Sequence, residues 1–165
     1  MVTATIVANR CEHYRKWAEL WYDEYPIDPD IILAVAAKES GCDPDATDGQ
    51  SMGLMQVTPR PWTLREEYLF NPKWNIYQGM QILYYALHNE AENPEGSLTR
   101  ALAGYNCGWD SLNAGKCIPG GGYDYAMEVM LFWLPVVRGD LRTWEPGVST
   151  GVGAVRRSYP QAPYH

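Results

Sequence analysis

The hydrophobic positions of this chain recur at helical spacing in five segments, which are separated by stretches rich in Gly, Pro, Asp and Asn. This pattern predicts helices at residues 9–24, 29–40, 72–89, 98–106 and 123–134. Asn9, Asp28 and Ser97 stand at the starts of three of these segments, where side chains of this kind cap helices, and another segment opens near Asn71-Pro72. Because there is no internal repeat and no sustained strand alternation, the sequence predicts an all-α fold.

Several of these segments carry an apolar stripe that we expect to face the core. The stripes are Tyr14, Trp17, Ala18 and Trp21 in the first helix, Ile76, Met80, Leu83, Tyr84 and Leu87 in the third, and Met127, Met130, Leu131 and Leu134 in the last. Residues 29–40 are apolar on nearly all sides and should form a buried central helix. We expect one domain over residues 1–134, followed by a Gly-, Pro- and Arg-rich extension, 135–165, that packs over the surface or frays.

The buried helix ends at a carboxylate, Glu39, just before Gly41 and the polar loop at residues 43–52. One interpretation is a solvated residue of the last helical turn. The other is an acid held half out of water, whose pKa burial would raise. The partial negative charge at a helix C-terminus would act in the same direction.

Composition limits the classes of partner. Of 165 residues, 46% are apolar and 20% are charged, which is typical of a globular domain. The net charge of −7 argues against nucleic acid or an anionic membrane as the main partner. No stretch is long and apolar enough to span a membrane, and the first residues do not resemble a signal peptide. Seven Trp and twelve Tyr could form core or stack on sugar rings.

The four cysteines, Cys11, Cys42, Cys107 and Cys117, lack the spacing of a metal site. They could form two disulfides in an oxidising compartment or remain buried thiols, and three pairings are possible. We favour Cys107–Cys117, because it closes a Gly-containing loop, and Cys11–Cys42 by elimination.

Four separated pieces occur in an order that is similar to a known family. They are Glu39-Ser40, GLMQ at 53–56, AGYNCG at 103–108 and YDYAMEVM at 123–130, with NPKWNIYQGMQIL at 71–83 between the second and third. This order resembles the soluble-type lytic transglycosylases, whose catalytic domain has a goose-type lysozyme fold. The resemblance covers about residues 28–134.

The resemblance implies a role for each matched residue. Glu39 matches the single catalytic acid, and Ser40 the hydroxyl beside it. The remaining substrate-facing positions are Met55 and Gln56 in the cleft-lining motif, Tyr105 and Asn106, and Tyr125, which is expected to hydrogen-bond near the acid. Simpler interpretations stay open: a core aromatic for Tyr125, a helix C-cap for Asn106, and a turn amide for Gln56.

The resemblance further implies cleavage of the β-1,4 bond between N-acetylmuramic acid and N-acetylglucosamine, with a 1,6-anhydro product. Glu39 would protonate the departing oxygen and then accept the proton of the sugar's own 6-hydroxyl, so that no second carboxylate, cofactor or metal is needed. We expect a monomer whose partner is the peptidoglycan glycan strand. It would act in the bacterial cell wall or periplasm, delivered by a phage, carried on a virion or secreted in mature form.

Three alternatives remain. A goose-type lysozyme would hydrolyse the same bond with a water activated by aspartate. Asp48 is the candidate, although Thr58 stands where the resemblance would place another aspartate. The chain could also be an inactive glycan-binding module. Calcium binding by DPDATDGQ at 43–50 is disfavoured, because its acids do not follow the EF-hand spacing.

Overall fold

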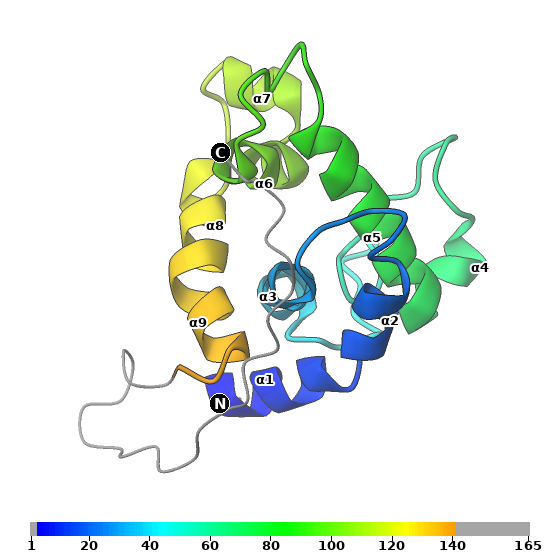
Figure 1. The fold of residues 1–165 in the computed structure, drawn as a ribbon. Helices are drawn as coiled ribbons and strands as arrows, with labels where there is room; N and C mark the ends of the chain where they lie inside the picture. The colour runs from blue at the N-terminus through cyan, green and yellow to red at the C-terminus, as the bar shows by residue number, and fades with distance from the viewer. Residues whose placement is uncertain (1–2, 141–165) are drawn as a thin grey trace.

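A computed structural model describes residues 3–140 of the chain (Figure 1). In chain order the elements are α1 Ala4–Glu12, α2 Arg15–Leu20, α3 Pro29–Ser40, α4 Glu66–Leu69, α5 Pro72–Leu87, α6 Leu98–Cys107, α7 Trp109–Asn113, α8 Tyr123–Glu128, the π-helical segment η1 Val129–Trp133, and α9 Leu134–Val137. Apart from isolated bridges that join Met52 to Thr47 and to Val57, this part of the chain contains no strand. The all-α prediction is confirmed, and most of the predicted C-terminal extension, from residue 141 onward, lies outside the described residues.

The central helix α3 begins and ends where its local sequence predicts. Asp28 accepts a hydrogen bond from the backbone N–H of Asp30 at 2.9 Å, and Gly41 ends the helix with a φ of +63°. Figure 1 shows α3 nearly end-on at the centre of the molecule, and it packs against α1, α2, η1 and α9. All residues from 31 to 37 are buried, whereas residues 38–40 are only partly buried. The last turn of α3 therefore reaches the edge of the core.

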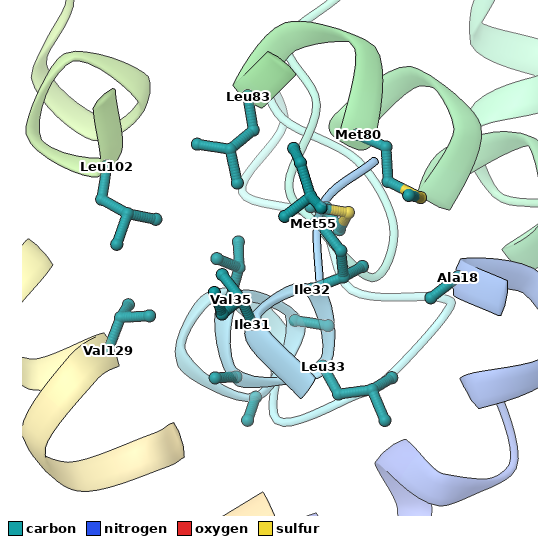
Figure 2. Close-up of a cluster of buried hydrophobic side chains, with 14 of the residues drawn as sticks. Ala18, Ile31, Ile32, Leu33, Val35, Met55, Met80, Leu83, Leu102 and Val129 are labelled. Atoms are coloured by element: carbon teal, nitrogen blue, oxygen red, sulfur yellow. The ribbon is translucent and has the colours of Figure 1, made fainter. Parts of the chain in front are cut away.

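The core forms where α3 meets segments that lie far from it in the sequence. Figure 2 shows Ile31, Ile32, Leu33 and Val35 of α3 close to Ala18, Met55, Met80, Leu83, Leu102 and Val129. Each of these side chains is at most 4% exposed. Full burial of a Val, Leu, Ile or Met side chain contributes about 1.5–3 kcal/mol, so these contacts hold α5, α6 and η1 firmly against the central helix.

The predicted first helix is two helices in the structure. The N-terminal one starts earlier than predicted, where the Thr3 hydroxyl accepts a hydrogen bond from Ile6 N–H, so Thr3 is the cap and Asn9 lies inside the helix. It ends at Glu12, and α2 begins at Arg15. No Gly or Pro stands at this break, so the helical spacing of the apolar residues predicted one continuous helix.

The last predicted helix has a different buried face and a later end. Met127 and Leu131 are 46% and 63% exposed, so their assignment to the core was wrong, and Tyr125 and Val129 are buried instead. The helical segment continues through η1 into α9, where Pro135 is the second residue, just after the π-helical turn. Beyond it, Arg138 pairs with the carboxylates of Asp28 and Asp30 at 3.0 and 3.1 Å. The folded unit therefore reaches past residue 134.

Both favoured disulfides are present. Cys11–Cys42 has a Cα–Cα distance of 5.2 Å and joins α1 to the chain just after α3, and Cys107–Cys117 has one of 5.6 Å and closes the loop around α7. The first of them ties down the chain three residues after Glu39. Loops closed in this way lose conformational entropy in the unfolded state, which stabilises the folded state.

Two further features concern only residues 3–140. None of the helices described there combines the length and hydrophobicity that a membrane crossing requires. No group of three or more His, Cys, Asp or Glu side chains in this range is arranged to hold a metal ion.

Candidate active site

The partly buried carboxyl of Glu39 is held by a tyrosine from another helix. Its Oε1 atom accepts a hydrogen bond from the Tyr125 hydroxyl at 2.6 Å. Burial raises the pKa of Glu39 to about 7, against the opposing effects of the Tyr125 hydrogen bond and the nearby Lys38 charge. The carboxyl can therefore carry a proton near neutral pH, as a general acid must.

Two phenols stand around this acid. Tyr125, on α8, is 2% exposed, and Tyr105, on α6, is partly buried and donates its hydroxyl to the Met55 carbonyl at 2.8 Å. Burial and the charge of Glu39 hold the pKa of both phenols well above the ordinary value. Both hydroxyls therefore stay protonated and act as hydrogen-bond donors. The expected contact between Tyr125 and the acid is confirmed, and the same side chain is also a core aromatic.

The turn at residues 53–56 is held by a buried asparagine that the sequence analysis did not single out. The Asn75 side chain accepts a hydrogen bond from Met55 N–H at 2.8 Å and donates to the carbonyls of Met52 and Leu69, both at 2.7 Å. Gly53 has a φ of +74°, and a Cβ there would lie 2.3 Å from Asn75 Nδ2. Glycine is therefore required for the turn to come this close to α5.

Met55 does not face outward as predicted. Its side chain is 0% exposed and packs on α5, where a Cβ added at Gly79 would lie 2.3 Å from its sulfur atom. The prediction that this side chain contacts a substrate was wrong, because an apolar side chain gains more by burial against the helix. Met55 contributes to the site through its carbonyl, which orients Tyr105.

Ser40 and Gln56 use their side chains to connect segments of the chain. The Ser40 hydroxyl is 2.8 Å from the Leu54 carbonyl, which joins the end of α3 to the turn. Gln56 has a φ of +48° and donates its side-chain amide to the carbonyls of Ala46 and Gly53 at 3.0 and 2.9 Å. The interpretation of Gln56 as a turn amide is therefore the one that these contacts favour.

Asn106 lies exposed near the end of α6, and its Oδ1 accepts a hydrogen bond from Gly122 N–H at 2.9 Å. The predicted C-cap position belongs to Gly108. Asn106 thus connects the end of α6 to the start of α8, the helix that carries Tyr125.

Asp48 lies in the exposed loop and has a local structural role. Its Oδ1 accepts hydrogen bonds from the N–H groups of Gln50 and Ser51 at 2.8 and 2.7 Å, and these bonds hold its pKa below the ordinary value. Its charge also raises the pKa of Glu39, as the smallest of the four contributions. Thr58 hydrogen-bonds with the Ser51 hydroxyl at 2.8 Å.

The raised pKa of Glu39 predicts a pH-dependent effect on stability. The carboxyl has an ordinary value of 4.5 and a folded-state value of about 7, so the folded protein binds more protons between these values. Stability linked to this proton is full below about pH 4.5 and is lost as pH rises towards 7. We expect the Tm of Glu39→Gln minus that of the wild type to grow with pH across this window, measured by circular dichroism.

The control for this experiment is Glu90→Gln, which removes a carboxylate from an exposed position. Its Tm difference from the wild type should stay nearly constant over the same pH range. A Tm difference for Glu39→Gln that did not change with pH would contradict the raised pKa.

Comparison with known proteins finds that the chain is similar to lytic transglycosylases. The chain is 30% identical, over 157 residues, to membrane-bound lytic murein transglycosylase F 1 of Alkalilimnicola ehrlichii, an alignment that covers 85% of this chain and 32% of the relative. The chain thus spans about a third of the length of that curated relative.

Solved structures share the fold. The 70-kDa soluble lytic transglycosylase of Escherichia coli superposes with a TM-score of 0.59 at 19% identity, over 78% of this chain and 24% of that one. An inactive glutamate-to-glutamine mutant of lytic transglycosylase Slt from Pseudomonas aeruginosa gives a TM-score of 0.55 at 20% identity, over the same shares of the two chains.

The family model described as "Transglycosylase SLT domain" matches residues 17–117, from α2 to the second cysteine of the Cys107–Cys117 disulfide. This match covers more than half of the chain and includes Glu39, the turn at 53–56 and Tyr105. By this match, the chain belongs to the transglycosylase SLT domain family.

Proposed function

We propose that this chain is a lytic transglycosylase domain that cleaves the β-1,4 bond between N-acetylmuramic acid and N-acetylglucosamine in peptidoglycan. The observation that carries the proposal is the partly buried Glu39, whose carboxyl has a pKa of about 7 and is held by the Tyr125 hydroxyl at 2.6 Å. The names of the relatives, a lytic murein transglycosylase and soluble lytic transglycosylases, support the same chemistry.

In the proposed reaction Glu39 acts twice. The neutral carboxyl first donates its proton to the glycosidic oxygen as the bond to the anomeric carbon breaks. The resulting carboxylate then accepts the proton of the 6-hydroxyl of the muramic sugar, whose oxygen bonds to the same anomeric carbon and closes the 1,6-anhydro ring. The attacking oxygen is already tethered to the sugar, so the step gains effective molarity and no water is consumed.

The environment of Glu39 supports both steps. Tyr125 binds Oε1, so Oε2 is the oxygen that would exchange the proton with substrate. A pKa near 7 favours donation and acceptance about equally at neutral pH, which suits a residue that must do both. We propose that Tyr105 lies at the substrate, while Ser40, Gln56 and Asn106 position the acid, the turn and α8 through the contacts described above.

Hydrolysis is the second candidate. Asp48 has a lowered pKa and lies where its charge reaches Glu39, so it could activate a water molecule. However, its Oδ1 already accepts two backbone hydrogen bonds in an exposed loop, and a threonine stands at position 58. These contacts favour the intramolecular route over a water-activating role. An inactive glycan-binding module would need no protonated acid at all.

The site of action follows from the substrate. We propose that the domain works on glycan strands in the cell wall or periplasm, as a monomer and without cofactor or metal. The two disulfides fit an oxidising compartment outside the cytoplasm. Delivery by a phage, carriage on a virion and secretion of a mature form are all compatible with this proposal.

The deciding experiment is mass spectrometry of the muropeptides released from purified peptidoglycan, with Glu39→Gln as the control. We expect 1,6-anhydro ends, one water lighter than reducing ends, from the wild type and almost none from the variant. Reducing ends would establish hydrolysis instead. If the folded wild type bound glycan without releasing any muropeptide, the enzyme proposal would fail in favour of a binding module.

A further inference from the structure

Two adjacent side chains at the end of α3 contact α8. Glu39 accepts the hydrogen bond from Tyr125, and the preceding residue, Lys38, forms an ion pair with Glu128, with Nζ 2.6 Å from Oε2. Tyr125 and Glu128 lie three positions apart on α8, so their side chains project from neighbouring parts of one helical face. The ion pair therefore stands directly beside the contact that holds the acid.

We propose that the Lys38–Glu128 ion pair is a positioning element of the active site, in which Glu128 neutralises the positive charge next to Glu39 and keeps α8 where Tyr125 reaches the acid. The consequence for catalysis rests on the proposed function of Glu39. The effect of the ion pair on the ionisation of Glu39 does not depend on that function.

The need for a neutralising partner follows from elementary electrostatics. An ammonium group beside a carboxyl stabilises the charged form, and Lys38 acts to lower the pKa of Glu39 in this way. A proton donor that ionises too readily is unprotonated at working pH. Because the Glu128 carboxylate lies within 2.6 Å of the ammonium, the pair is close to neutral as seen from Glu39, and its net effect on the acid is smaller than that of a lone lysine.

The other groups that act on the pKa of Glu39 do not offset the positive charge of Lys38 in the way that Glu128 does. Tyr105 from α6 and Tyr125 from α8 stay neutral, since burial holds the pKa of each phenol well above its ordinary value. Asp48, from the exposed loop, makes the smallest contribution. Of the charged groups that act on the pKa of Glu39, Lys38 has the largest effect, and Glu128 is the carboxylate that pairs with it.

The geometry also explains why the pair would position α8. Tyr125 is 2% exposed, so its hydroxyl can reach Glu39 only if α8 keeps its rotation about its own axis. The side chains of Lys38 and Glu128 are 27% and 42% exposed, and a pair this exposed contributes little to global stability. Its loss should therefore affect the acid more than the fold.

The test uses Lys38→Met and Glu128→Gln, which change the charge next to Glu39 in opposite directions. Glu128→Gln leaves the lysine unbalanced, so the pKa of Glu39 should fall by about 0.5 pH unit. Lys38→Met removes the positive charge, so the pKa should rise by a similar amount. We would measure the pKa of Glu39 in each variant by carbon-13 NMR titration of its labelled carboxyl. We would also measure how the rate of peptidoglycan turnover falls at high pH, because turnover requires protonated Glu39.

The matched control is Glu67→Gln, which breaks an exposed ion pair with Arg65 and should leave the titration unchanged. The double variant Lys38→Met/Glu128→Gln removes both charges and should titrate closer to the wild type than either single variant. Its titration also tests the proposal if one single variant fails to fold.

Shifts of opposite sign would support the proposal. Shifts in the same direction, or an equal loss of rate at every pH with no shift, would overturn it, because both variants would then act only by loosening α8 and the Tyr125 contact, with no charge effect of Glu128 on the acid. The NMR titration separates this result from the proposed function. Opposite shifts in a protein that does not cleave peptidoglycan would leave the charge effect standing and reject the enzyme.

Discussion

Replacing Glu39 with glutamine is expected to slow the turnover of purified peptidoglycan by about 10²–10⁴-fold, the usual contribution of general acid–base help. The amide keeps the size of the side chain, and its oxygen can still accept the Tyr125 hydrogen bond, which measures 2.6 Å to the native carboxyl. It can neither donate a proton to the departing oxygen nor accept one from the 6-hydroxyl. The measurement is the rate of release of soluble muropeptides at neutral pH.

Two further variants make this result specific. Glu90→Gln removes a carboxylate from an exposed position and should retain the wild-type rate. Asp48→Asn separates the two candidate reactions, since the intramolecular route predicts little loss and a water-activating aspartate predicts a large one. Full turnover by Glu39→Gln would mean that another residue supplies the proton.

Replacing Asn75 with alanine is expected to lower the free energy of unfolding by roughly 2 kcal/mol or more, because each buried polar group left without a partner costs about 1–3 kcal/mol. The side chain is 0% exposed and bonds to the Met55 N–H and the Leu69 carbonyl, while the Met52 carbonyl, to which it also donates, keeps a hydrogen bond from Val57 N–H at 3.0 Å. These groups lie in or near the turn that carries the Tyr105 acceptor. Urea unfolding followed by fluorescence measures the loss.

The control for this experiment is Asn9→Ala in α1, which makes the same chemical change within a helix at an exposed residue. Because alanine favours the helix at both positions, the difference between the two variants isolates the buried hydrogen bonds. If Asn75→Ala unfolded at the same urea concentration as Asn9→Ala, the asparagine would not be what holds the turn.

The parts of this fold that the sequence predicted depend on contacts within a few residues. Asp28 and Gly41 define the ends of α3, Ser97 caps α6 as expected, and α5 opens at Asn71-Pro72, where Asn71 is the cap. A cap bonds to a backbone group two or three positions away, so its signal is contained in a short stretch of sequence. The same holds for the placement of Glu39 in the last turn of an apolar helix.

The predictions that failed concern which way a side chain points. Met127 and Leu131 have the spacing of a buried stripe, yet their side chains are exposed. Tyr125 and Val129 lie on the buried face of this helical segment instead. Met55 belongs to a motif expected to line a cleft, and its side chain is in the core. Asn75 is a polar residue among apolar neighbours, which was a usable signal for a buried amide with backbone partners.

The sequence by itself determined the all-α class, the buried central helix, the acid at its end and the family to which the chain is similar. Only the tertiary structure decided what that acid can do. Tyr125 lies 86 residues from Glu39, and Glu128 lies 90 residues from Lys38. A pKa depends on the atoms within a few ångströms of the carboxyl, and folding, which periodicity along the chain does not describe, brings those atoms together.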